Sequence, residues 1–421
     1  MKRARRRSAL ASALFVAISL TCGACAAIFG FEELGSEKFD AGTTPEASTP
    51  DAPVDGGSDV VVPGPGCDKI GIPDKPIATD SGSGDEEEIL VAINTLDIGI
   101  TTAAGFNLDR ACSPTRQLSS CIAGGSGTDF DEFGKDTDDA GTDNAGFALL
   151  KTVGAFGGGF EPSAINERLR DGEFGGVIRI TKWNGTPDDT DIVFEVFPAL
   201  GVSVDQGGTY VRKTSSVDAG FGPTDHWHRD TRFEGVSGVS TQFSLNAWVS
   251  GGRVYARFAQ LVIPVNVPDD PKPLDLTMRE AIISAKLVQE NGAYRLTDGI
   301  LGGRIATKDF LRDVRTIYVL DNNGVKNAFL CTSGSLGPTL YNLVKQKVCI
   351  ARDIIGSGVD DRTKGCDAFS AGFRVDTYAL TDRAFYEGNT NFEALGPDAT
   401  APRCTVNPGV PEGDDCAPAT P

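Results

Sequence analysis

The feature that most constrains the fold is a stretch between residues 177 and 301 in which apolar and polar residues alternate. Segments such as 192–196 and 243–249 have this period of two, which is typical of strands with one buried face. Residues 184–189 and 250–252, rich in Gly, Asn, Asp and Ser, interrupt the pattern as hairpin turns do. Roughly eight short strands predict a mainly β domain, either an antiparallel sandwich or a jelly-roll-like fold.

Other elements precede this stretch. Residues 89–101 predict a strand, and residues 143–153 and 162–171 predict two short helices. The second helix begins with a proline and is followed by Gly172, as helix termini favour. We therefore predict one β-rich domain over residues 89–301 that includes both helices.

The C-terminal part has helical periodicity instead. Residues 308–315 predict a short helix, and an apolar stripe from Leu340 to Ile355 predicts a longer one. Because Cys349 lies on the longer helix, we predict that residues 302–396 form a small helical cap tied by disulfides. Residues 397–421 return to Pro, Gly and acidic residues and form a predicted tail.

The first 24 residues are typical of an export signal. Five Lys and Arg residues precede an apolar run over residues 9–20, which is shorter than the roughly 20 residues that span a bilayer. Preceded by Gly23 and Ala24, Cys25 resembles the lipidated cysteine of a bacterial lipoprotein signal, although Cys22 stands where that family usually has Leu. The resemblance implies cleavage before Cys25 and a lipid anchor on it. The alternative is an ordinary secreted protein, cut at a nearby small-residue site.

Cleavage at that position leaves an even number of cysteines, as an oxidising compartment favours. We predict that all of them form disulfides, with a connectivity that the spacing alone leaves open. These eight residues are Cys67, Cys112, Cys121, Cys331, Cys349, Cys366, Cys404 and Cys416.

Residues 25–88 separate the predicted anchor from the domain. From Gly35 to Glu88 they are dominated by Gly, Ser, Thr, Pro and acidic residues, with too little apolar surface to fold. We predict a disordered acidic spacer that tethers the domain; the alternative is a neutral, solubilising tail. Signal, spacer and Cys-rich β domain together resemble the surface lipoproteins of large-genome soil bacteria. The resemblance implies an outer-membrane lipoprotein, on the periplasmic face or at the cell surface.

The charge of the chain limits its partners. It has 39 Lys and Arg against 58 Asp and Glu, a net charge of −19. Such an acidic surface argues against nucleic acid as a partner, because phosphate backbones need a basic surface. It also disfavours adhesion of the folded part to anionic headgroups. We therefore predict membrane attachment through the lipid anchor.

One acidic segment is a candidate calcium site. Asp136, Asp138, Asp139 and Asp143 lie close together in a Gly-containing stretch, and hard oxygen ligands are what Ca²⁺ requires. The segment begins like an EF-hand loop, but Ala140 stands at the third ligand position and no Glu closes the loop. A solvated acidic loop is the competing prediction.

His226 and His228 are the two histidines of the chain. In an extended segment their rings point the same way, as in an H-x-H metal pair, and Asp225 or Asp230 could complete or orient such a site. Arg229 adds an unfavourable positive charge, so an exposed polar loop is the competing prediction.

Aromatic residues in the strand-rich stretch suggest a ligand class. Trp227 and Trp248 are candidates for stacking on sugar rings, against the alternative of core packing. The chain has no G-x-S-x-G, H-E-x-x-H or Walker sequence. We therefore predict a non-catalytic, membrane-anchored envelope lipoprotein with a structural or binding role and carbohydrate as the expected ligand. The alternative is a metal-dependent or carboxylate-based hydrolase of extracellular polymers.

Overall fold

The computed structural model of the chain describes residues 73–77, 87–97, 104–113, 115, 119–134, 136, 141–150, 162–205, 210–213, 222, 225–235, 238–265, 274–315, 317–320, 326–329, 337–358, 360–380, 385–386 and 415–417. All of these residues belong to one unit of the chain, residues 60–421. Several predictions therefore fall outside the described residues. They are the signal over residues 1–24, most of the spacer and of the tail, Cys25, Asp138, Asp139, Cys67, Cys331 and Cys404.

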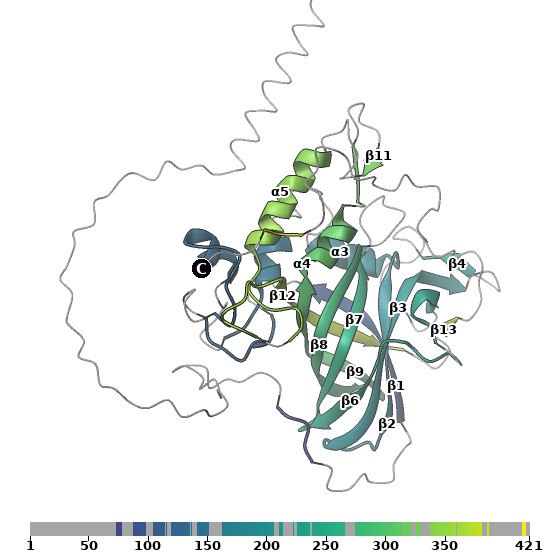
Figure 1. Ribbon diagram of the computed structural model, residues 1–421. Coiled ribbons are helices and arrows are strands. Elements are labelled where there is room, and N and C mark those ends of the chain that lie inside the picture. The colour runs from purple at the N-terminus through teal and green to yellow at the C-terminus, as the bar shows by residue number, and fades with distance from the viewer. Residues whose placement is uncertain are drawn as a thin grey trace, which may run out of the picture. The chain divides into compact units, whose positions relative to one another are not determined.

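Eight of the described strands pair into a closed antiparallel barrel (Figure 1). Each strand pairs with the next around the barrel, and β3 also pairs with β6 to close it. The predictions of a mainly β domain and of antiparallel strands are confirmed. In spatial order the strands are β3 (Asp189–Asp205), β2 (Gly175–Trp183), β1 (Glu87–Asp97), β12 (Ala368–Ala379), β9 (Ala293–Ala306), β8 (Leu274–Glu290), β7 (Arg253–Val265) and β6 (Phe243–Ser250).

Closure of the sheet differs from the predicted sandwich or jelly roll. A sandwich keeps two stacked sheets, whereas the pairing of β3 with β6, for example Ile192 opposite Ala247, joins the two edges of one sheet. The alternation of apolar and polar residues is the same in both architectures, because each strand has one buried face in either. The sequence pattern therefore predicted the barrel strands other than β12 without distinguishing closure from stacking.

The inner faces of the strands form the main core. An eight-stranded barrel is just wide enough for side chains to fill. Phe194 of β3 and Phe258 of β7, for example, meet edge to face with ring centroids 6.0 Å apart, and both are almost completely buried. The barrel is therefore closed by backbone pairing and packed by apolar side chains.

Helices cover further apolar surface of the same core cluster. They are α3 (Pro162–Arg170), α4 (Thr307–Val314) and α5 (Gly337–Ile350), and residues 145–150 are helical as well. These positions confirm the predicted helices. No helix in the described part of the chain is long and apolar enough to cross a membrane. The remaining short elements include η2 (Phe130–Gly134), η3 (Thr231–Phe233), β10 (Tyr318–Leu320) and β11 (Lys326–Phe329).

A separate apolar cluster lies on the other face of β1, β2 and β3. The second half of β3 pairs with β4 (Tyr210–Arg212) and β5 (Asp225–Arg229), and β5 pairs with β13 (Phe385–Tyr386). Trp227 of β5 is fully buried in this cluster. Gly175 lies beneath the indole, where any Cβ would overlap the ring.

Disulfides join segments that are far apart in the sequence. Cys121 is bonded to Cys366, and Cys349 of α5 is bonded to Cys416. Cys112 is disulfide-bonded as well. Residues 302–396 supply α4 and α5, as predicted for the cap, and they also supply β12, which lies between β1 and β9 in the barrel.

The segment 104–113 crosses β9 and β12 where two glycines face each other. Gly302 and Gly372 are register partners on the face that points away from the core. A Cβ on Gly302 would overlap the ring of Phe106, and one on Gly372 would overlap the carbonyl oxygen of Ala104. The absence of side chains at this pair is what lets the segment approach the sheet.

We expect Gly372→Ala to lower the free energy of unfolding by about 2–3 kcal/mol, because overpacking against a fixed backbone typically costs about 1–3 kcal/mol. Urea unfolding measures this change. Gly222→Ala is the control, since its Cβ would meet only the Asp225 carboxylate at 3.8 Å, and it should change stability by less than about 0.5 kcal/mol. Equal stability of the two variants would contradict a close crossing at Gly372.

Candidate functional site

The predicted histidine pair lies on β5. Because Trp227 points into the apolar cluster, His226 and His228 point to the opposite face of the strand, as strand alternation requires. His228 is 4% exposed, and its Nε2 lies 2.7 Å from Oγ of the fully buried Ser203 of β3. The pair therefore shares a face, as predicted, and on that face the side chain of His228 contacts a serine.

Basic side chains bind the carboxylates beside this pair. Asp225 accepts two hydrogen bonds of 2.8 Å from Nζ of the buried Lys213, and Asp230 binds the guanidinium of Arg232 at 2.6 Å. Within the described ranges, no three His, Cys, Asp or Glu side chains are placed to hold a metal ion. The predicted metal site at the histidine pair thus finds no supporting carboxylate in Asp225 or Asp230.

Both candidate sugar-stacking residues are fully buried. Trp248 stacks on Tyr255 with ring centroids 5.2 Å apart, and the Arg257 guanidinium lies 5.6 Å from the Trp248 ring. Trp227 fills the cluster between β5 and β3. Neither indole presents a free face to a sugar ring, so core packing, the alternative prediction, describes both residues.

The two described candidates for calcium ligands bind backbone amides. Oδ2 of Asp143 accepts hydrogen bonds from the N–H groups of Leu108 at 2.6 Å and Asp109 at 3.3 Å. Oδ2 of Asp136 accepts one from the N–H of Ser113 at 2.5 Å. In the described part of the chain, no three His, Cys, Asp or Glu side chains are placed to hold Ca²⁺ here.

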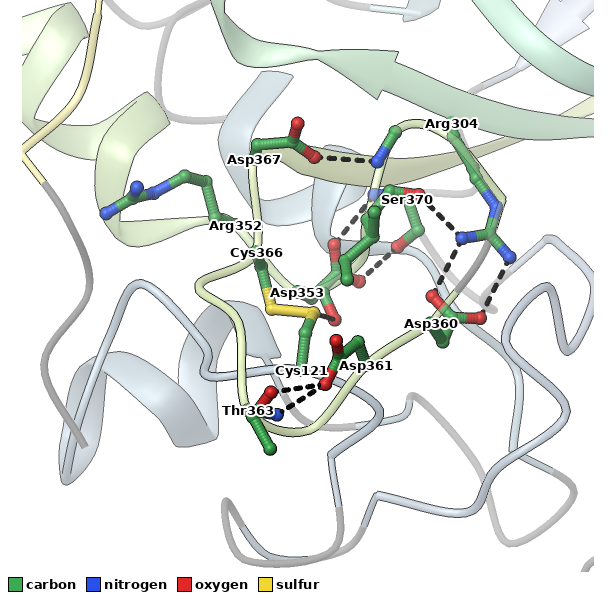
Figure 2. Close-up of a disulfide and its surroundings, with 12 residues drawn as sticks. Cys121, Arg304, Arg352, Asp353, Asp360, Asp361, Thr363, Cys366, Asp367 and Ser370 are labelled. Carbon is green, nitrogen blue, oxygen red and sulfur yellow. Dashed lines mark hydrogen bonds and ion pairs between the residues drawn. A yellow bond between two sulfur atoms is a disulfide. The ribbon is translucent and has the colours of Figure 1, made fainter. Parts of the chain in front are cut away.

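Asp143 belongs instead to a group of carboxyls that the sequence did not reveal. Asp109, Asp143 and Asp353, which we name the carboxyl cluster, come from distant segments and repel one another electrostatically. Asp353 lies beside the Cys121–Cys366 disulfide, at the point where these segments meet the outside of the barrel (Figure 2). We take this cluster as the candidate functional site.

Asp353 binds the backbone of β12 beyond the described part of β1. Pairing between β1 and β12 ends at Arg374, so the amides of Ser370 and Gly372 lie beyond the described part of β1. Oδ1 of Asp353 accepts a hydrogen bond from the Ser370 N–H at 2.8 Å, and Oδ2 accepts one from the Ser370 hydroxyl at 2.5 Å (Figure 2). Oδ1 of Asn144 accepts one from the Gly372 N–H at 3.1 Å. Side chains thus satisfy these two backbone amides of β12.

Arg304 of β9 is the register partner of Ser370. It binds the loop residues Leu108, Ile355 and Asp360 to the outside of the barrel. Its side chain is 2% exposed and faces the Asp360 carboxylate, with Nη1 and Nη2 donating to Oδ1 and Oδ2 at 2.9 and 3.2 Å (Figure 2). Nη1 also donates to the carbonyl oxygen of Ile355, and Nη2 to that of Leu108, both at 2.7 Å. A bidentate pair of this kind fixes orientation as well as adding energy.

The carboxyl cluster binds protons more tightly than free carboxyls do. Burial raises the pKa of Asp353 to about 7, with a further contribution from the charge of Asp109. Burial, followed by repulsion from Asp109 and Asp353, raises the pKa of Asp143 well above its usual value. Burial also raises the pKa of Asp109, against the hydrogen bond from the Ala111 amide. These carboxyls therefore retain their protons at pH values at which a free carboxyl is ionised.

Local sequence patterns marked only one member of this site. Asp143 was a candidate calcium ligand, but in a chain with 58 acidic residues nothing distinguishes Asp109 or Asp353 from the others. One usable signal was Gly302 and Gly372, because glycine inside a strand often marks the close approach of another backbone. That signal locates the crossing of segment 104–113 but not the acids that follow it.

Comparisons with known proteins do not assign the chain to a family. No protein-family model matches the chain, and neither a curated protein nor a solved structure matches it. The function is therefore argued from the residues and their contacts.

We expect Arg304→Gln to lower the free energy of unfolding by about 3–5 kcal/mol, because it leaves the Asp360 carboxylate without its buried partner. Arg312→Gln is the matched control: Arg312 is 53% exposed in its ion pair with Asp309, and its loss should cost less than about 1 kcal/mol. Chemical denaturation of both variants measures the difference. Similar losses in the two variants would show that Arg304 does not hold the loops.

Proposed function

We propose that the chain is an exported, lipid-anchored protein of the cell envelope with a structural or binding role and no catalytic one. Acylated Cys25 attaches it to the membrane, and residues 25–88 hold the domain away from the bilayer. The observation that carries the proposal is the pairing of Cys121 with Cys366 and of Cys349 with Cys416. Structural disulfides persist in oxidising compartments and are rare in the cytosol.

The positions of the disulfides also support a domain that lies outside the cytoplasm. Cys121 and Cys366 are 245 residues apart in the sequence, so their bond closes a long loop, and long loops gain the most from closure in chain-entropy terms. The Cys349–Cys416 bond ties α5 to the described C-terminal residues, where Asp415 also pairs with Lys308 at 3.1 Å. Such staples suit an exported domain that must stay folded without cytosolic chaperones.

The contacts described above favour a structural or binding role over catalysis. Ion pairs occupy Asp225 and Asp230 beside the histidines. Burial of Trp227 and Trp248 removes the residues on which carbohydrate recognition was predicted. We therefore propose the role without assigning it a sugar ligand.

Acylation of Cys25 can be tested in the full chain. We expect the wild-type protein to incorporate labelled palmitate and to sediment with membranes, because two or more acyl chains anchor a protein stably. Cys25→Ala should abolish the label and the membrane association. Cell fractionation with metabolic labelling measures both.

Cys22→Ala is the matched control for that experiment, since Cys22 precedes the proposed cleavage site. It should keep the label and the membrane association. A Cys25→Ala protein that is still labelled, or a Cys22→Ala protein that is not, would refute the assignment of the anchor.

A second candidate function, a hydrolase of extracellular polymers, has one observation in its favour. Ser203 Oγ and His228 Nε2 lie 2.7 Å apart, which is the spacing of a serine nucleophile and its base. Ser203 is fully buried, however, so its Oγ offers no approach to a polymer in this structure. The contact therefore fits a buried structural hydrogen bond better.

We expect Ser203→Ala to lower the free energy of unfolding by about 1–3 kcal/mol, because it removes the buried hydrogen bond between Ser203 Oγ and Nε2 of His228. The wild-type protein should show no ester or glycoside hydrolysis above the level of this variant. Thermal melts and chromogenic substrate panels measure the two effects. Turnover that Ser203→Ala removes at an unchanged melting temperature would favour the hydrolase instead.

A further inference from the structure

Residues 239–245, which lead into β6, reverse the usual pattern of a strand. In the described part of the chain, five large apolar side chains are exposed, and three of them lie here, between 42% and 65% exposed. These three residues, which we name the outer stripe, are Val239, Phe243 and Leu245. The buried polar residues between them are Ser240, Gln242 and Ser244. Apolar residues on the outside of a strand indicate a surface that binds something else.

Hydrogen bonds explain why the polar residues point inward. In the described residues, backbone pairing of β6 with β7 is confined to residues 247–250 of β6. Before that stretch, Ser244 Oγ donates to the carbonyl oxygen of Arg257 at 2.6 Å, and Gln242 Nε2 donates to that of Val262 at 3.2 Å. Side chains thus join the two strands here, and strand alternation turns the apolar residues outward.

The first described residues of the chain, 73–77, lie against the same strand. Lys75 Nζ donates to the carbonyl oxygen of Leu245 at 3.4 Å. Asp74 Oδ1 lies 3.8 Å from Nη2 of Arg257 on β7. The N-terminal part of the chain therefore reaches the barrel beside one end of the outer stripe.

We propose that the outer stripe binds residues 60–62 of the same chain, three consecutive valines in the predicted spacer. Docking covers apolar surface that otherwise faces solvent, on the stripe and on the valines alike. It also shortens the free spacer to residues 25–59. The proposal does not rest on the lipid anchor, because residues 60–62 remain after cleavage at either predicted site.

The valines suit the outer stripe in composition and in reach. Between Gly35 and Pro73 they are the single run of three apolar residues, and in an extended chain the first and third point to the same side. Residues 63–66 have the sequence P-G-P-G, which is typical of a turn. Pro73 follows Val62 by eleven residues, which span at most about 40 Å, and the outer stripe extends over only about 20 Å.

Charge and tethering favour this occupant over a second copy of the chain or a bilayer. The net charge of −19 makes two copies repel each other, and it makes anionic headgroups repel the domain. A segment that is attached beside the stripe instead competes for it at an effective concentration on the order of millimolar. The nearest apolar run of the chain is therefore the favoured occupant.

Hydroxyl-radical footprinting of the full chain at low concentration tests the docking. We expect Phe243 and Leu245 to be oxidised about threefold more slowly in the wild-type protein than in a Val60→Ser/Val62→Ser variant, because the docked state predominates at that effective concentration. Val288 of β8, 37% exposed, is the internal control. Its oxidation should be equal in both proteins.

The reciprocal variant, Phe243→Ser/Leu245→Ser, should release the valines. We expect elastase, which cleaves after valine, to cut the chain at residues 60–62 about threefold faster in this variant than in the wild-type protein. Val288→Ser is the matched control, because it also removes an exposed apolar side chain of the barrel. It should be cut there at the wild-type rate.

Equal oxidation of Phe243 in the wild-type protein and in the valine variant would overturn the proposal, as would equal elastase cleavage in the folded reciprocal variant. Protection of Phe243 that disappears on dilution would indicate a second copy instead. Protection that appears only with zwitterionic lipid vesicles would indicate a bilayer. If Phe243→Ser/Leu245→Ser does not fold, the footprint of the valine variant decides, because its substitutions lie outside the barrel strands.

Discussion

The two halves of β3 pair with different strands along the same edge, and the rest of the domain is arranged around these two pairings. Its first half, from Asp189 to Glu195, pairs with β6 and closes the barrel; its second half, from Ala199 to Val204, pairs with β5. Closure creates the interior that the main core fills. The second half supports β5, whose Trp227 covers the outer faces of β1 and β2. Register shifts in both pairings let one strand serve two neighbours.

On the opposite strands, polar side chains bind backbone groups of the sheet and of the loops around it. Beyond the described part of β1, Asp353 and Asn144 bind the amides of β12, and Arg304 of β9 binds the carbonyl oxygens of Ile355 and Leu108. Buried polar groups of this kind must be hydrogen-bonded, because an unpaired buried amide is costly. Burial raises the pKa of the Asp353 carboxyl to about 7, whereas the hydrogen bonds that it accepts from Ser370 favour its ionised form.

The candidate site could be predicted from the sequence only in part. The rule that alternate residues share a strand face placed His226 and His228 on one side of β5 correctly. It did not reveal Ser203, which comes from β3, nor the burial of Trp227, which depends on the bare backbone at Gly175. Similarly, the acids of residues 136–143 were visible as a cluster. Their hydrogen bonds to the amides of residues 108–113 were not, because those amides belong to another segment.

The sequence by itself determined the barrel strands other than β12, the helices α3, α4 and α5, and the abundance of cysteines suited to disulfides. Each of these depends on residues a few positions apart: period two makes one face of a strand apolar, and glycine or proline ends an element. Only the tertiary structure decided the closure of the barrel, the bond between Cys121 and Cys366, and the meeting of Asp143 with Asp353. Burial and electrostatic repulsion depend on which segments folding brings together, and no local pattern encodes that.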